Sequence, residues 1–88
     1  MRLDKWLKES RLVKRRAVAQ ELCRAGRAWL NGRPAKPGSE VREGDRLRLL
    51  LGGRLLEVTV LEGEPRPGNA QPVFRLEEER QPPPGEAG

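Results

Sequence analysis

The sequence contains no histidine, no tyrosine and only one cysteine, Cys23, among its 88 residues. The lack of histidine removes the most common general base and a common zinc ligand, which disfavours most hydrolases and metalloenzymes. A single cysteine forms no disulfide within the chain, which fits a reducing compartment. We therefore expect no catalytic residues, no metal site and no cofactor, and we expect Cys23 to pack as a small apolar residue.

Long apolar runs are also missing. Hydrophobic and charged residues each make up 35% of the chain, and no run approaches the roughly 20 apolar residues of a transmembrane helix. Residues 1–6 lack the apolar core of a signal peptide, so we expect a cytoplasmic protein. A chain of 88 residues forms one small domain at most, which leaves no room for a separate catalytic domain.

Positive charge is concentrated in the first part of the sequence. Residues 1–54 hold 15 basic and 6 acidic side chains, a net charge of +9, whereas residues 55–88 hold 3 basic and 7 acidic ones, a net charge of −4. A basic half on a small domain favours a polyanionic partner, such as a nucleic acid. The alternative is that the charges only keep the domain soluble, although solubility does not require this separation.

Helical periodicity is present at the start of the chain. The apolar residues Leu3, Trp6 and Leu7 lie on one face of a helix predicted over residues 2–9. Asp4 and Lys8 lie four residues apart in the same helix, in the order that favours an ion pair along its surface.

A second helix is predicted over residues 15–25 and ends before Gly26, a residue typical of helix stops. Its polar face carries Arg16, Gln20 and Arg24 at intervals of four residues. The opposite face is apolar and consists of Val18, Ala19, Leu22 and Ala25, with Cys23 at its edge.

From residue 28 onward the apolar residues recur with a period of two, which is typical of β-strands. Turns are predicted at Asn31-Gly32, which is a strong signal for a type I′ turn, and at Gly52-Gly53. The predicted strands are residues 28–30, residues 46–51, a return strand through Leu56, Val58 and Val60, and residues 73–76. The fold class is therefore α+β, with two N-terminal helices packed on a small antiparallel sheet. We expect this domain to cover residues 1–79 and the proline-rich residues 80–88 to be a disordered tail.

Three cations, Lys14, Arg15 and Arg16, fall at the start of the second predicted helix. Cations there oppose the helix macrodipole at a cost of about 0.3–1 kcal/mol each, and the lack of a capping side chain forfeits about 1 kcal/mol. A bound phosphate would reverse both effects, because it accepts the free N–H groups and pairs with the guanidinium groups. The alternative is that the helix begins elsewhere and the three cations are solvated.

The two tryptophans have different expected roles. Trp6 lies on the apolar face of the first predicted helix, so we expect it in the core. Trp29 lies in a strand whose two faces alternate, and the sequence leaves open whether it packs in the core or offers a stacking surface to a base. The acidic run Glu77-Glu78-Glu79 is expected to be solvated.

Several segments together resemble the alpha-L RNA-binding family, a module of a small-subunit ribosomal protein. The segments are Arg2-Leu3-Asp4-Lys5-Trp6-Leu7, Ser10-Arg11-Leu12-Val13-Lys14, Ala25-Gly26-Arg27-Ala28-Trp29-Leu30-Asn31-Gly32 and Val41-Arg42-Glu43-Gly44-Asp45. The resemblance covers residues 2–51. It implies RNA binding by Arg2, Lys5, Arg11, Lys14, Arg15 and Arg16, and the basic surface of the two helices adds Arg24.

Stand-alone members of this family are small ribosome-associated proteins, and this chain is most similar to those of bacterial ribosome quality control. The resemblance implies binding to 23S rRNA and P-site peptidyl-tRNA on an obstructed large ribosomal subunit. It also implies assistance to the partner RqcH during C-terminal alanine tailing of the stalled chain, by a monomeric protein that is not an enzyme. Three alternatives stay open: a heat-shock-type factor that recycles blocked subunits, an RNA-binding subunit of a separate rRNA- or tRNA-modifying enzyme, and an adaptor for an acidic protein.

Overall fold

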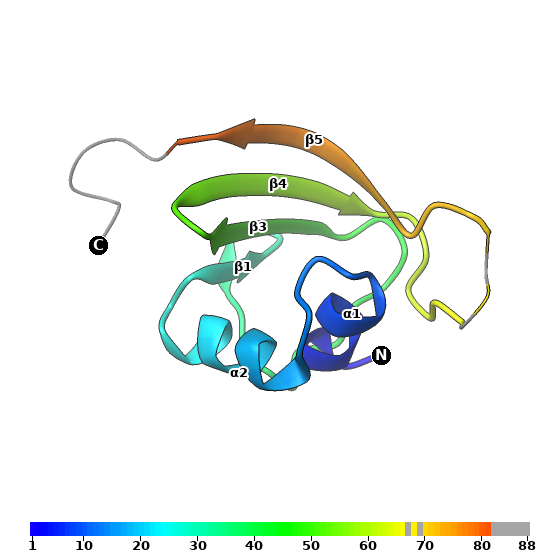
Figure 1. Ribbon diagram of the computed structural model, residues 1–88, viewed down its shortest axis with the longest axis horizontal. Coiled ribbons are helices and arrows are strands. Elements are labelled where there is room, and N and C mark those ends of the chain that lie inside the picture. The colour runs from blue at the N-terminus through cyan, green and yellow to red at the C-terminus, as the bar shows by residue number, and fades with distance from the viewer. Residues whose placement is uncertain (67, 69, 82–88) are drawn as a thin grey trace.

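The computed structural model describes residues 1–66, 68 and 70–81, within which two helices and five strands form. The helices are α1 (Leu3–Glu9) and α2 (Arg16–Arg24). The strands are β1 (Ala28–Leu30), β2 (Arg33–Pro34), β3 (Arg46–Leu51), β4 (Arg54–Val60) and β5 (Phe74–Arg80). They form one antiparallel sheet in the order β2-β1-β3-β4-β5. Both helices lie on the same side of this sheet (Figure 1), so the predicted α+β class is confirmed.

The core lies between the helices and the inner face of the sheet. Alternation along β3 and β4 turns Leu47, Leu49, Val58 and Val60 toward the helices. Each of these four side chains is at most 1% exposed. The strands therefore bury one face only, as expected of a small antiparallel sheet covered by helices on one side.

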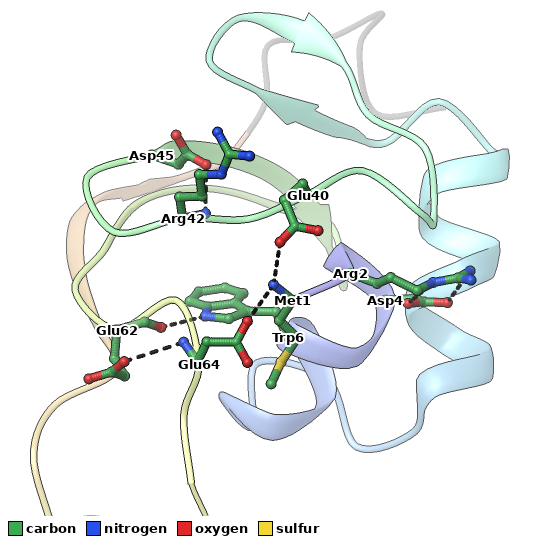
Figure 2. A network of polar contacts seen from close by, with 9 residues as sticks. All are labelled: Met1, Arg2, Asp4, Trp6, Glu40, Arg42, Asp45, Glu62 and Glu64. Atoms are coloured by element: carbon green, nitrogen blue, oxygen red, sulfur yellow. Dashed lines mark hydrogen bonds and ion pairs between the residues drawn. The ribbon is translucent and has the colours of Figure 1, made fainter.

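Trp6 is the largest fully buried side chain of this core. Its indole N–H donates a hydrogen bond to the Glu62 carbonyl at 2.8 Å (Figure 2). The ring also meets Phe74 edge-on, with 6.5 Å between the ring centroids. Because the apolar ring is packed and its one polar atom has a partner, the prediction that Trp6 belongs to the core is confirmed.

Helix α2 buries Ala19, Leu22 and Cys23. Cys23 packs as the predicted apolar residue, and its burial raises the pKa of the thiol. The predicted apolar face was wrong at Val18, which is 47% exposed, and at Ala25, which is the exposed C-cap of the helix. The helix is turned so that Cys23 rather than Val18 faces the core, and this rotation also changes the direction of its polar face.

Both predicted hairpin turns form. Asn31 and Gly32 have φ values of 51° and 82°, and Gly52 and Gly53 have φ values of 56° and 77°. Positive φ at both central residues is the mark of the type I′ turn, whose twist matches that of the flanking strands. The turns place β1 beside β2 and β3 beside β4.

Strand β5 is longer than the sequence predicts. The predicted strand covers residues 73–76, but β5 continues through the acidic run to Arg80, which pairs with Leu55 of β4. Glutamate has a low strand propensity, which hides this strand in the sequence. The glutamates are exposed, as predicted, but they form ion pairs: Glu77 with Arg75, Glu78 with Arg80 and Glu79 with Arg54. Arg80, which the prediction assigns to the tail, therefore ends the sheet, and residues 82–88 of that tail lie outside the described residues.

Candidate nucleic-acid interface

A buried carboxylate lies between the two helices. Asp4, in the first turn of α1, is 0% exposed. The Arg2 guanidinium donates from Nε to Oδ1 and from Nη2 to Oδ2, both at 3.2 Å (Figure 2). From α2, Gln20 Nε2 donates to Oδ2 at 3.0 Å, and Arg16 Nε lies 3.3 Å from the same oxygen. We call Arg2, Asp4, Arg16 and Gln20 the arginine cluster.

The hydrogen bonds within the arginine cluster keep Asp4 ionised. Burial of the Asp4 carboxyl by itself raises its pKa. Hydrogen bonds outweigh burial and lower the pKa from 3.8 to about 2; in decreasing order of effect they come from Gln20, Arg16, Arg2 and the Lys5 backbone N–H. Two guanidinium groups share this one carboxylate, so one of their two positive charges is left uncompensated.

The arginine cluster corrects two expectations. The sequence predicts a pair between Asp4 and Lys8 along α1, but Asp4 turns toward α2, and Lys8 lies 3.7 Å from Glu9 instead. The sequence also predicts that Arg16 and Gln20 lie on a polar face opposite the core, but both contact the buried Asp4. Spacing within one helix does not distinguish a pair along that helix from a contact between two helices.

The two arginines of the cluster keep donors for another anion. A guanidinium carries five N–H donors, of which Arg2 directs two and Arg16 one toward Asp4. Their side chains are 55% and 45% exposed. The donors that remain suit a bidentate contact with the oxygens of a phosphate.

The start of α1 is fixed by neighbouring loops. The Asp4 backbone N–H donates to the Pro37 carbonyl at 3.0 Å. The Met1 amino group donates hydrogen bonds to the carboxylates of Glu40 and Glu64, both at 2.8 Å (Figure 2). These contacts hold the first turn of α1, and with it the arginine cluster, against the rest of the domain.

The start of α2 is a second cationic feature. Its N-cap is Arg15, in an extended conformation with φ −133° and ψ 141°, and no side chain of the described residues makes a capping hydrogen bond there. Arg16 is the first helical residue, so the predicted placement of cations at this helix start is confirmed. Lys14 and Arg15 are exposed beside the free N–H groups, an arrangement that favours an anion.

The turn between the helices holds Arg11 in a left-handed conformation. Its φ is 67°, a region that costs a residue other than glycine about 1–2 kcal/mol. The turn is fixed around it, because the Arg11 N–H donates to the Lys8 carbonyl at 3.0 Å and the Ser10 hydroxyl donates to the Leu7 carbonyl at 2.9 Å. Glycine would avoid this cost, so the exposed arginine at this position indicates a role for its side chain.

A groove beside this turn includes a cation that the sequence analysis did not single out. Four cations and one carboxylate line the groove: Lys8, Glu9, Arg11 and Lys14 from α1 and the turn, and Arg66 from the connection between β4 and β5. Arg66 belongs to the acidic second half of the chain, and only the return of this connection toward α1 brings it to the basic turn. No pattern in the sequence marks it.

The remaining predicted RNA-binding residues lie apart from these groups. Lys5 is exposed on α1, next to Asp4. Arg24 is exposed in the last turn of α2, about 12 Å along the helix axis from Arg16. The structure thus gathers Arg2 and Arg16 in the arginine cluster, Lys14 and Arg15 at the start of α2, and Arg11 with Lys14 in the groove, and it leaves Lys5 and Arg24 separate.

The sheet face that points away from the helices is largely neutralised. Arg48 lies 2.7 Å from Glu57 across the β3–β4 ladder. Trp29 also lies on this outer face, opposite Arg48 in the β1–β3 ladder, because its neighbours Ala28 and Leu30 pack on the core side. Trp29 is half-buried. The helix side therefore carries the excess of positive charge.

The chemistry that this surface offers is the binding of anions by guanidinium and ammonium groups. Within the described residues, no group of three histidine, cysteine or acidic side chains is arranged to hold a metal ion. In the same part of the chain, neither helix has the length and apolar character needed to cross a membrane.

Comparisons with known proteins agree on one family. Residues 1–47 match the family model of the S4 domain. The RQC P-site tRNA stabilizing factor of Halalkalibacterium halodurans is 43% identical over 81 residues, which cover 90% of this chain and 92% of that relative. The factor of the same name from Bacillus subtilis is 50% identical over 62 residues, which cover 70% and 72% of the two chains. Among solved structures, trimeric Heat Shock Protein 15 of Vibrio cholerae matches with a TM-score of 0.75 and 30% identity, over 86% of this chain and 80% of that chain.

Proposed function

Because the chain belongs to the S4 domain family, and within it to the RQC P-site tRNA stabilizing factors (RqcP), we propose that it binds obstructed large ribosomal subunits through 23S rRNA and P-site tRNA. In this proposal it holds peptidyl-tRNA in the P site during ribosome-associated quality control. The partner RqcH extends the stalled chain by C-terminal alanine tailing. The chain itself acts in the cytoplasm as an RNA-binding factor rather than as an enzyme.

The observation that carries this proposal is the arginine cluster. Arg2 and Arg16 come from the starts of two different helices, and Asp4 holds both guanidinium groups at one carboxylate. Their remaining donors suit a phosphate, and the cations of the groove extend the basic surface along the turn between the helices. Contacts to the phosphate backbone position a protein on a folded RNA, which is what a factor on an rRNA and tRNA surface requires.

A heat-shock-type factor that recycles blocked subunits is the second candidate. The match to Heat Shock Protein 15 of Vibrio cholerae supports it, because the fold is shared. The identity of 30% to that protein is lower than the 43% and 50% to the two stabilizing factors. Similarity therefore favours the quality-control function.

We also propose that the chain acts as a monomer. One chain closes its own core, because core side chains of both helices and of the inner sheet face, such as Trp6, Leu22 and Leu49, are buried without a second copy. Light scattering after size-exclusion chromatography should give the mass of one chain at micromolar concentration. A mass of three chains, which would match the trimeric Heat Shock Protein 15 of Vibrio cholerae, would contradict this part of the proposal.

Sedimentation of C-terminally tagged protein on a sucrose gradient tests the proposed function. A C-terminal tag is preferable because the Met1 amino group contacts Glu40 and Glu64. We expect the protein to migrate with large subunits that carry peptidyl-tRNA and alanine-tailed chains. Association with large subunits without alanine tails would favour the recycling function, and recovery only in ribosome-free fractions would contradict both.

Variants of exposed cations sharpen this test. Arg15→Ala should weaken the association and lower its salt dependence by about one unit, because one phosphate contact is lost. Arg33→Ala removes the same charge from the exposed strand β2, outside the predicted RNA-binding residues, and serves as the matched control. Equal effects of the two substitutions would mean that total charge, rather than the start of α2, determines binding.

A further inference from the structure

We propose that Asp4 is a positioning residue for RNA binding: it fixes Arg2 and Arg16 as a paired clamp for phosphate, although Asp4 is itself an anion. This inference rests on the proposed function and assigns a role within the same interface. Asp4 need not touch RNA, because it is 0% exposed and acts through the two arginines.

Both arginines of the cluster direct donors to the same acceptor, the Asp4 carboxylate. Arg2 is the N-cap of α1 and Arg16 opens α2, so neither helix alone sets the distance between the two guanidinium groups. Each arginine directs its Nε toward the carboxylate. This orientation leaves Nη1 of Arg2 and both terminal nitrogens of Arg16 available to a second anion.

Two further hydrogen bonds hold the Asp4 carboxylate in place. The Lys5 backbone N–H donates to Asp4 Oδ1 at 2.8 Å, and Gln20 donates to Oδ2 at 3.0 Å. An exposed arginine without such an anchor samples many rotamers and loses that freedom when it binds a phosphate. Asp4 reduces this loss, because Arg2 and Arg16 are already held before RNA arrives.

Charge alone predicts the opposite effect for the removal of Asp4. Asp4→Asn raises the net charge of +5 by one unit, and nonspecific attraction to a polyanion then increases. If positioning dominates, the same substitution weakens binding. The sign of the change in affinity therefore separates the two explanations.

The experiment measures binding of C-terminally labelled protein to purified large ribosomal subunits that carry peptidyl-tRNA. We expect Asp4→Asn to weaken binding about tenfold, the size of the coupling within one salt-bridge network. Glu21→Gln is the matched control, because it removes an acidic charge from the exposed side of α2 without a contact to the cluster. It should leave binding unchanged or tighten it by about twofold at most.

A double-mutant cycle tests whether Asp4 affects RNA binding through the two arginines. In a protein that already carries Arg2→Ala and Arg16→Ala, the addition of Asp4→Asn should not weaken binding further, because the groups that Asp4 positions are gone. A further loss of about tenfold in that background would contradict the proposal.

Two more variants distinguish a loss of arginine positioning from a loss of folding stability. Gln20→Ala keeps every charge and removes one donor that holds Asp4, so we expect roughly threefold weaker binding. Val58→Ala opens a cavity in the sheet core, and it should lower the melting temperature without a change in affinity below that temperature.

The outcomes distinguish this inference from the proposed function. Wild-type or tighter binding by folded Asp4→Asn would overturn the positioning role alone; if that variant does not fold, wild-type binding by Gln20→Ala would do so. Equal losses in Val58→Ala and Asp4→Asn at equal melting temperature would also overturn it, since stability would then explain the effect. A lack of binding by the wild-type protein would overturn the proposed function and this inference together.

Discussion

Replacement of Arg11 by glycine should raise the stability of the domain and weaken its binding to RNA. Arg11 lies in the turn between α1 and α2 with a φ of 67°, and its side chain lines the basic groove. The backbone at this position favours glycine, whereas the side chain serves the surface. The two effects of Arg11→Gly therefore have opposite signs.

The expected gain in stability follows from two contributions. Glycine removes the cost of about 1–2 kcal/mol that a left-handed conformation imposes on arginine. It also makes the unfolded chain more flexible, which costs about 0.4–1 kcal/mol. The net effect is a stabilisation of up to about 1.6 kcal/mol, at roughly 5 °C in melting temperature per kcal/mol for a domain of this size. The hydrogen bond from the Arg11 N–H to the Lys8 carbonyl does not depend on the side chain and stays.

Three variants at this position distinguish the effect of the backbone conformation on stability from the effect of the side chain on RNA binding. Arg11→Gly and Arg11→Ala should lower the affinity for large subunits equally and reduce the salt dependence by about one unit, but only Arg11→Gly should melt at a higher temperature. Arg11→Lys should keep the salt dependence. Thermal melting without RNA and binding across salt measure the two properties. A glycine variant that melts below Arg11→Ala, or that binds like the wild type, would refute the reasoning.

Three further predictions concern other parts of the molecule. Trp6→Ala should destabilise the domain by roughly 3–5 kcal/mol in thermal melting without RNA, and a wild-type melting curve would contradict its place in the core. Asp4 has a pKa of about 2 in the folded protein against an ordinary 3.8, so its ionised form stabilises the domain above pH 4. Lowering the pH from 4 to 2 should therefore reduce the free energy of unfolding by about 2 kcal/mol. Asp4→Asn should lose less stability over the same pH range. Arg66→Ala should weaken binding to large subunits as much as Lys14→Ala does if both sides of the groove contact RNA, and an unchanged affinity would restrict the interface to the helices.

The elements with a clear period could be predicted from the sequence. The apolar stripe through Leu3, Trp6 and Leu7 and the alternation along residues 46–51 depend on burial of one face, which the sequence records directly. The turn at Asn31-Gly32 was equally predictable, because few residues accept positive φ at two successive positions. Each of these features is local.

The features that escaped prediction depend on contacts between distant segments. Asp4 has an acceptable partner four residues away in Lys8, and nothing local indicates that α2 supplies a better one in Arg16. The acidic part of β5 has a low strand propensity, and the Arg54 side chain that pairs with Glu79 lies 25 residues away in the sequence. Arg66 approaches Arg11 only through the path of the β4–β5 connection.

The basic and acidic halves of the sequence end on different faces of the domain, because β5 adds the acidic run to the edge of the sheet while the basic first half forms the helices. On the outer face, Arg48 of the basic half pairs with Glu57 of the acidic half, and Glu77 pairs with Arg75. The two helices and their turn, residues 2–24, carry eight basic and only three acidic side chains. A domain with one neutral and one positive side turns in the field of a polyanion before contact. The helix side should therefore meet RNA first, with Arg2 and Arg16 already held by Asp4 in the orientation that a phosphate requires.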